Sequence, residues 1–122
     1  MTEPDETAPI KLEKWQDATN ARGDAYVAQE GRKARMTNAA TEKLTRAMSR
    51  QEKGSATPGE ASSVRGIVDE LRVRVDDRWY RLLFKRKGDK WVTLRLIVKK
   101  TNKLDNSDVE LAKKRLAEHT WS

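Results

Sequence analysis

The segment 67–75 ends in a strict alternation of charged and apolar side chains over residues 70–75, and no other feature constrains the fold of this chain as strongly. Leu71, Val73 and Val75 are separated from one another by arginines, so an extended backbone places the three apolar side chains on one face. This period of two predicts a half-buried β-strand. The apolar face of such a strand needs further strands and helices to cover it.

Two more strands follow after short connections. Asp76-Asp77 supplies a turn, and the second strand is predicted over residues 79–86. Gly88-Asp89 then closes a hairpin to a third strand over residues 90–98. Three consecutive strands with tight connections predict an antiparallel meander, which places Arg81 on the face opposite the more apolar one and therefore outward.

Helices are predicted on both sides of the meander in the sequence. One is expected over residues 11–29, and a second begins with Asn38 as its cap and ends at Gly54. A third starts at Ser107, which forms a capping-box pattern with Glu110. The expected fold is an α+β domain: two N-terminal helices, a curved antiparallel sheet of three or four strands and a C-terminal helix, with the helices on one side of the sheet.

The expected organisation is a short tail followed by one domain. The ranges are a disordered tail over 1–10 and a domain over 11–122, divided into a helical part at 11–53, a loop at 54–63 and the sheet with its C-terminal helix at 64–122. Charge separates the two halves of this domain. Residues 1–62 carry 10 Lys and Arg against 10 Asp and Glu, whereas residues 63–122 carry 16 against 9.

Several classes of chemistry are excluded by residues that the chain lacks. It has no cysteine, so disulfides, thiolate nucleophiles and Cys-based zinc sites are ruled out. Its one histidine, His119, makes a His-ligated metal site or a Ser-His-Asp triad hard to build. No apolar stretch approaches the roughly 20 residues of a membrane span. Acidic residues open the chain in place of the basic region of a secretory signal, so we expect a cytoplasmic protein without membrane association.

Basic residues gather on the predicted strands and just after them. They are Arg72, Arg74, Arg81, Lys85, Arg95, Lys99, Lys100 and Lys103. A surface with this charge favours a polyanionic partner such as RNA. The same charges would also be explained by solubility and by protection of sheet edges. Composition alone leaves both interpretations open.

Four segments resemble, in order, the signature of RelE/HigB-type toxins, in particular the phage-derived HigB-like group. They are Leu71-Arg72-Val73-Arg74-Val75, Trp79-Tyr80-Arg81-Leu82-Leu83-Phe84, Val98-Lys99-Lys100-Thr101-Asn102-Lys103 and the helical Glu110-Leu111-Ala112-Lys113-Lys114-Arg115. The resemblance covers about residues 64–119. Members usually begin with a β-strand, for which only Ile10-Lys11-Leu12 could serve here.

This resemblance implies a RelE-like fold and a toxin that inhibits translation as a metal-independent endoribonuclease, cutting mRNA on the ribosome without a cofactor. It also implies a cognate antitoxin, of helix-turn-helix type. The implied catalytic residues are Arg72, Arg74, Arg81, Lys99 and Lys100, with Arg81 as the transition-state stabiliser. The RNA-binding residues expected from the basic strand surface are Lys85, Arg95 and Lys103. Arginine suits such a site because its planar fork binds phosphate oxygens and stays charged.

Two alternatives remain at this stage. The same scaffold could bind RNA or the ribosome without cutting, since fold does not determine chemistry. It could also be a structural protein whose charge serves solvation only. His119 is a possible site residue, although a histidine at the end of a helix also has a structural explanation.

Overall fold

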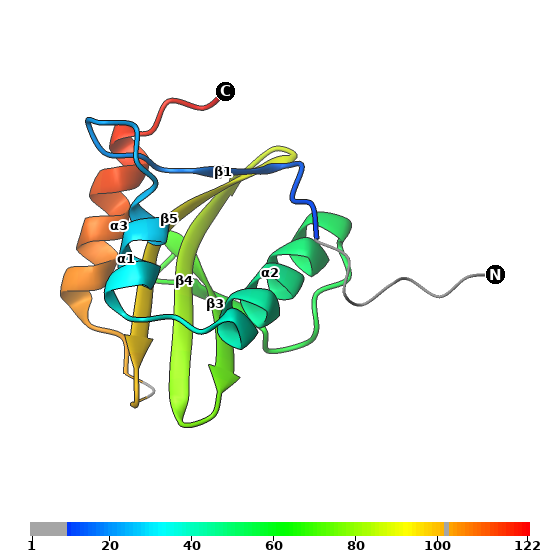
Figure 1. Cartoon of the computed structure of the whole chain (residues 1–122). Coiled ribbons are helices and arrows are strands. Elements are labelled where there is room, and N and C mark those ends of the chain that lie inside the picture. The colour runs from blue at the N-terminus through cyan, green and yellow to red at the C-terminus, as the bar shows by residue number, and fades with distance from the viewer. Residues whose placement is uncertain (1–9, 102) are drawn as a thin grey trace.

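The computed structural model describes residues 10–101 and 103–122, which form three helices and a five-stranded mixed sheet (Figure 1). The elements are β1 (Trp15–Asp17), α1 (Tyr26–Lys33), α2 (Asn38–Lys53), β2 (Ala61–Val64), β3 (Val68–Val75), β4 (Arg78–Lys87), β5 (Lys90–Lys99) and α3 (Asn106–Glu118). The tail expected over residues 1–10 lies outside the described residues except for Ile10. No helix in the described ranges is long and apolar enough to span a membrane.

The antiparallel meander of β3, β4 and β5 is confirmed, and the sheet extends beyond it at both edges. Its strand order is β1-β5-β4-β3-β2. β2 pairs antiparallel with β3 and begins inside the expected loop 54–63. β1 pairs parallel with β5, so the expectation of an antiparallel sheet of three or four strands is wrong. The early strand lies at Trp15–Asp17 rather than at residues 10–12.

A strand, a turn and a shorter helix replace the helix expected over residues 11–29. β1 occupies the start of this segment, and α1 occupies its end. Between them, Oδ1 of Asn20 accepts hydrogen bonds from the backbone nitrogens of Arg22 and Asp24 at 2.9 and 3.0 Å. This side-chain turn competes with helix formation. Gly23 adopts a φ of 85°, which a helix cannot accommodate.

α2 matches the predicted second helix, with a different N-cap. Oγ1 of Thr37 accepts a hydrogen bond from the backbone nitrogen of Ala40 at 3.1 Å, so Thr37 caps the helix and Asn38 is its first residue. Gly54 ends the helix in the left-handed region at a φ of 71°.

The C-terminal helix is also confirmed, but the capping box is not formed. Asp105 is the N-cap of α3, so Ser107 lies inside the helix. The Asp105 carboxylate binds Lys99 and makes no capping hydrogen bond. An ion pair with β5 has therefore replaced the local cap that the sequence pattern predicted.

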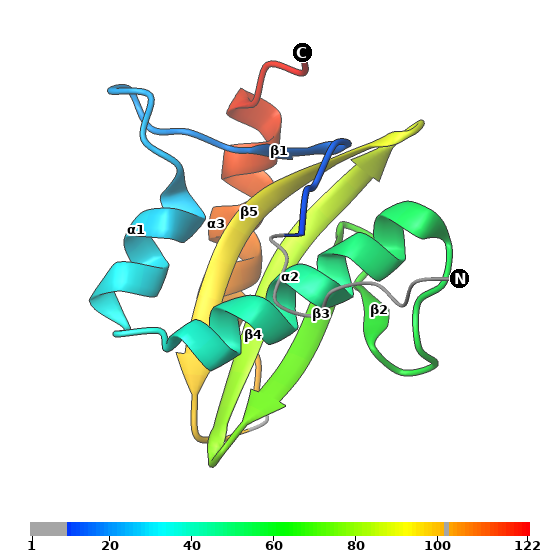
Figure 2. The same cartoon turned by 45° about the vertical axis from the view of Figure 1, so that its right-hand side comes forward.

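Helices cover both faces of the sheet, which corrects the expected one-sided arrangement (Figure 2). α2 packs across β3 and β4, where its Leu44 joins a core that contains Leu71 and Leu82. α3 packs on the other face, where its Val109 joins a second core that contains Leu83. β4 is therefore apolar on both faces over its central residues.

β5 contains a bulge where α3 crosses it. The register between β4 and β5 shifts after Leu83, and Leu94 is the extra residue. A bulge leaves backbone groups outside the ladder of hydrogen bonds. Nη1 of Arg115, from α3, donates to the Leu94 carbonyl at 2.9 Å and so satisfies the bulged residue.

Glu30 of α1 closes the edge of β5 beyond this bulge. One of its carboxylate oxygens accepts a hydrogen bond from the Leu96 backbone nitrogen at 3.1 Å. The other pairs with Arg95 and with Nη1 of Arg115, the latter at 2.9 Å. One carboxylate thus connects α1, β5 and α3 at a sheet edge that would otherwise expose unpaired backbone groups.

We expect Glu30→Ala to lower the free energy of unfolding by about 3 kcal/mol, because it leaves two guanidinium groups and a backbone N–H without their shared acceptor. Chemical denaturation measures this loss. Glu42→Ala is the matched control, since Glu42 pairs with Arg46 one helical turn away at an exposed position and should contribute about 0.5 kcal/mol. Equal effects of the two substitutions would contradict the central role of Glu30.

Candidate functional site

A row of basic side chains crosses three strands on the face that α3 partly covers. Arg72 lies opposite Arg81, Arg74 lies opposite Trp79, and Trp79 lies opposite Lys99. Directly opposite residues of paired strands have their side chains on the same face of a sheet. These five residues are called the cationic face below. It contains four of the five predicted catalytic residues.

Glu70 lies within this row and is almost completely buried. Its Oε1 accepts from Nη1 of Arg81 at 2.8 Å and lies 3.3 Å from Nε of Arg72. Like charges directly across a sheet repel one another. The carboxylate of Glu70 offsets the repulsion between the two arginines and holds both guanidinium groups beside it.

Arg81 does not face solvent, so its expected outward orientation is wrong. Only 4% of its side chain is exposed, compared with 33% for Arg72. The expectation assumed that one face of the sheet is covered. Because α3 buries the second face as well, Arg81 lies beneath the surface and Arg72 is the accessible member of the pair.

Lys99 has acidic as well as basic neighbours. Its Nζ binds the Asp105 carboxylate and lies 3.7 Å from Oδ2 of Asp108. The hydrogen bond from Lys99 lowers the pKa of Asp105 below its ordinary value. The surroundings of Lys99 are therefore mixed in charge.

Arg95 is held inside the fold. Its Nη2 lies 3.0 Å from Oδ1 of Asp108, and its Nη1 pairs with Glu30. Burial opposes the charged form of Arg95, but the hydrogen bonds that Arg95 donates to the carboxylates of Glu30 and Asp108 raise its pKa above the ordinary value. The guanidinium of a predicted RNA-binding residue thus stabilises the junction of α1, β5 and α3.

The other predicted contacts lie around the cationic face. Lys85 is half-buried on the same face of β4, towards the hairpin with β5. Lys100 and Lys103 are exposed in the segment between β5 and α3. Arg74 is exposed too, so the cations that a polyanion could reach include Arg72, Arg74 and Lys100.

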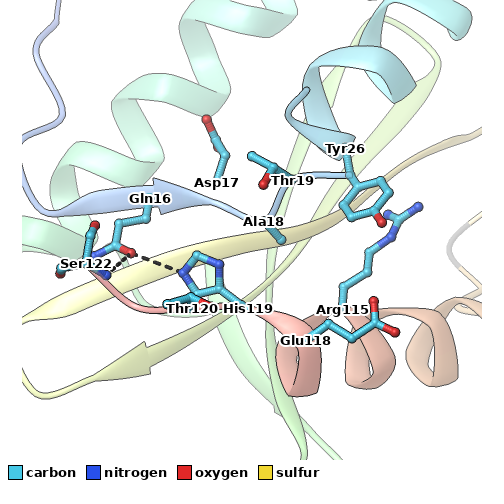
Figure 3. A pocket seen from close by; sticks show the side chains of 10 residues that line it. All are labelled: Gln16, Asp17, Ala18, Thr19, Tyr26, Arg115, Glu118, His119, Thr120 and Ser122. Carbon is cyan, nitrogen blue, oxygen red and sulfur yellow. Dashed lines mark hydrogen bonds between the residues drawn. The ribbon is translucent and has the colours of Figure 1, made fainter. Parts of the chain in front are cut away.

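His119 lies in a separate pocket of about 540 Å³ between β1 and the end of α3 (Figure 3). Oε1 of Gln16 accepts from the Ser122 backbone nitrogen at 3.1 Å, which fixes the orientation of the amide. Nε2 of His119 lies 3.1 Å from the same oxygen and must therefore carry the proton. Burial lowers the pKa of His119 below its ordinary value.

The pocket is far from the cationic face. Gln16 lies opposite Val92 near the start of β5, while Lys99 ends this strand, about 20 Å further along. Arg115 and Tyr26 line the pocket beside His119, with the guanidinium of Arg115 placed over the Tyr26 ring at 3.8 Å. The structure does not bring His119 together with the predicted catalytic arginines.

Sequence reasoning missed the carboxylates that organise these basic groups. They are Glu30, Glu70, Asp105 and Asp108. Glu70 could have been found, because it shares a strand face with Arg72 and the paired arginines need a counter-charge. Glu30 had no such signal, since its partners are remote in sequence. Among the described residues, no group of three or more His, Asp or Glu side chains could hold a metal ion.

A family model named Phage derived protein Gp49-like (DUF891) matches residues 34–117. This match covers the two longer helices and the strands β2 to β5. The chain belongs to this family. Gp49-like proteins are a RelE/HigB-like toxin family of toxin–antitoxin systems, which confirms the general type indicated by the four sequence segments. A search of curated proteins finds no match.

For this Gp49-like protein we expect Arg81→Ala to lower the free energy of unfolding by about 3–5 kcal/mol, because it leaves the buried Glu70 with the one-third exposed Arg72 as its remaining partner. Denaturation with urea measures the loss. Arg74→Ala, at an exposed position of the same face, should change stability by no more than about 0.5 kcal/mol. A fully stable Arg81→Ala protein would show that the Glu70–Arg81 pair does not support the fold.

The lowered pKa of His119 predicts a pH dependence of stability. The unfolded chain takes up this proton more readily than the folded protein, so stability should fall as the pH drops below about 6.5. Proton NMR of the single histidine should give a titration midpoint below that value. His119→Gln should remove this part of the pH dependence, and a midpoint at or above the ordinary value would contradict the burial of the ring.

Proposed function

We propose that the protein is the toxin of a toxin–antitoxin pair and that it cleaves mRNA on the ribosome through the cationic face. The observation that carries this proposal is the convergence of Arg72, Arg74 and Lys99 on one face of the sheet, next to the exposed Lys100. Arg72 and Arg74 come from β3 and Lys99 comes from β5, and these two strands fix the positions of their backbones. The family supports the toxin class, and the cleavage is our inference.

The charges of this face suit RNA cleavage by the 2′-hydroxyl. The 2′-oxygen forms a bond to the adjacent phosphorus while the bond from phosphorus to the 5′-oxygen breaks. A base accepts the 2′-proton, and the leaving 5′-oxygen takes up a proton. The transition state carries more negative charge on the phosphate than the ground state, so fixed cations lower the barrier. This route needs no metal ion.

We assign Arg72 and Arg74 to phosphate contact and Arg81 to a supporting role. Arg72 is one-third exposed and Arg74 is exposed, whereas Arg81 is buried behind Glu70. Because Arg81 and Arg72 share one carboxylate oxygen, Arg81 restrains that carboxylate and thereby the position of Arg72. Preorganised charge of this kind costs no reorganisation during the reaction. Lys99 and Lys100 remain candidates for proton transfer or phosphate contact.

A non-catalytic RNA-binding or ribosome-binding protein is the second candidate. The ion pairs of the titratable side chains beside the arginines favour this candidate. Glu70 is bound to two guanidinium groups, and Lys99 is bound to two carboxylates. A general base must be free to accept a proton. The partners in both cases are mRNA and the ribosome, and the cognate antitoxin is a further expected partner of the toxin.

Programmed ribosomes test the cleavage directly. Purified protein is incubated with ribosomes that hold a defined message, and the 5′ ends of the RNA are mapped. We expect cuts within the message, and we expect Arg72→Ala and Arg74→Ala each to slow cleavage on the order of 10² to 10³-fold. Induced expression in cells should show the corresponding relief of growth inhibition.

Arg22→Ala is the matched control for this experiment. Arg22 is exposed, and its hydrogen bond to Asn20 uses the backbone nitrogen, so the substitution removes one positive charge far from the cationic face without loss of a side-chain contact. Its cleavage rate should equal that of the unmodified protein. Intact message together with salt-dependent RNA binding would favour the non-catalytic candidate.

A further inference from the structure

Trp79 occupies the middle of the cationic face. It is the second residue of β4, opposite Arg74 on β3 and opposite Lys99 on β5. Its side chain is therefore flanked by a cation on each neighbouring strand. An isolated half-buried tryptophan on a surface needs no explanation. A tryptophan placed between two cations on a sheet, however, combines an aromatic ring with positive charge on both sides.

The other tryptophans of the chain have partners within the fold. Trp15 and Trp91 stack at 6.0 Å between ring centroids and belong with the core under α2. Trp121 packs against the second core and contacts the ring of His119 at 5.1 Å. Trp79 belongs to neither of the two cores formed by the described residues.

The Trp79 ring contacts a cation. Cζ of Arg74 lies 5.6 Å from the ring centroid, within the range of a cation–π interaction. Arg74 is exposed and Trp79 is half-buried, so the pair lies at the surface. The arrangement offers an aromatic platform with a phosphate-binding group beside it.

Single-stranded RNA is recognised through this combination of groups. Unpaired bases stack on aromatic rings, and the backbone between them is held by basic side chains. Stacking accepts any base because every base has a π-face. Acidic protein segments would use the cations of such a surface but would gain little from the indole ring.

We propose that Trp79 forms a nucleobase subsite, in which one unpaired base of the RNA stacks on the indole while Arg74 contacts the neighbouring phosphate. This inference rests on the proposed binding of RNA by the cationic face and names the group that recognises a base there. Cleavage is not required for it. The subsite belongs equally to a toxin or to a non-catalytic RNA-binding protein.

Two oligomers of equal charge separate stacking from phosphate attraction. The probes are a labelled single-stranded RNA hexamer and a hexamer of the same sugar–phosphate backbone without bases. Fluorescence anisotropy measures their binding to the full chain. We expect Trp79→Leu to weaken binding of the base-bearing RNA by about 5- to 150-fold and to leave binding of the abasic oligomer within about twofold. Trp79→Phe should retain most of the affinity, because it keeps an aromatic ring.

Two further variants serve as controls. Trp121→Leu removes a tryptophan at the other end of the sheet, near His119, and should bind both oligomers as the unmodified protein does. Arg74→Ala should weaken binding of both oligomers by the same factor. Circular dichroism melting checks that Trp79→Leu is folded, and Trp79→Phe provides the comparison if it is not.

Equal affinity of Trp79→Leu and the unmodified protein for the base-bearing RNA would overturn the subsite. The same loss of affinity for both oligomers would overturn it too, as would Trp79-dependent binding of an acidic peptide in place of RNA. The ribosome assay reports separately on the proposed function. If the message stays uncut but Trp79 is needed for tighter binding of the base-bearing RNA, the proposed cleavage is rejected and the subsite stands. If the message is cut but binding shows no such dependence on Trp79, the subsite is rejected and the cleavage stands.

Discussion

The bulge at Leu94 of β5 is the constraint on which the rest of the architecture depends. Pairing of β1 with β5 ends at Thr93, directly before the bulge, and the backbone groups that follow on this edge have no strand beside them. Arg115 satisfies the bulged carbonyl, and Glu30 accepts the Leu96 N–H. Arg115 and Glu30 also pair with each other, so α1 and α3 are both held against β5 at this bulge.

The same principle organises the cationic face. Carboxylates that lie among several basic residues on one face of a sheet stabilise it, because like charges across strands repel. Glu70 pairs with two arginines, and Asp108 pairs with Arg95 and Lys99. The carboxylates neutralise the cations beneath α3 and leave Arg74 at the surface. Burial and ion pairing together thus decide which positive charges of the strands a polyanion can reach.

Sequence patterns predicted the centre of this fold and failed at its edges for physical reasons. β3, β4, β5 and α2 carry local periodicity, so their positions could be read within one or two residues. β1 and β2 are short and take their structure from pairing with distant strands, which no local pattern contains. The basic residues of the site could be named, but their exposure could not, because Leu83 and the residues around it give the sheet a second buried face.

This second buried face changes the interpretation of the arginine pair. A buried guanidinium bound to a carboxylate cannot reach a phosphate without losing a partner in a medium of low dielectric constant, where an unpaired charge is costly. In the proposed function Arg81 would therefore act on RNA through Glu70 and Arg72 rather than directly. The histidine of the chain lies about 20 Å away along β5 and cannot exchange protons with the same phosphate. In the proposed reaction, any proton transfer at the cationic face would therefore involve Lys99, the neighbouring Lys100, Glu70 or groups of the bound RNA and ribosome.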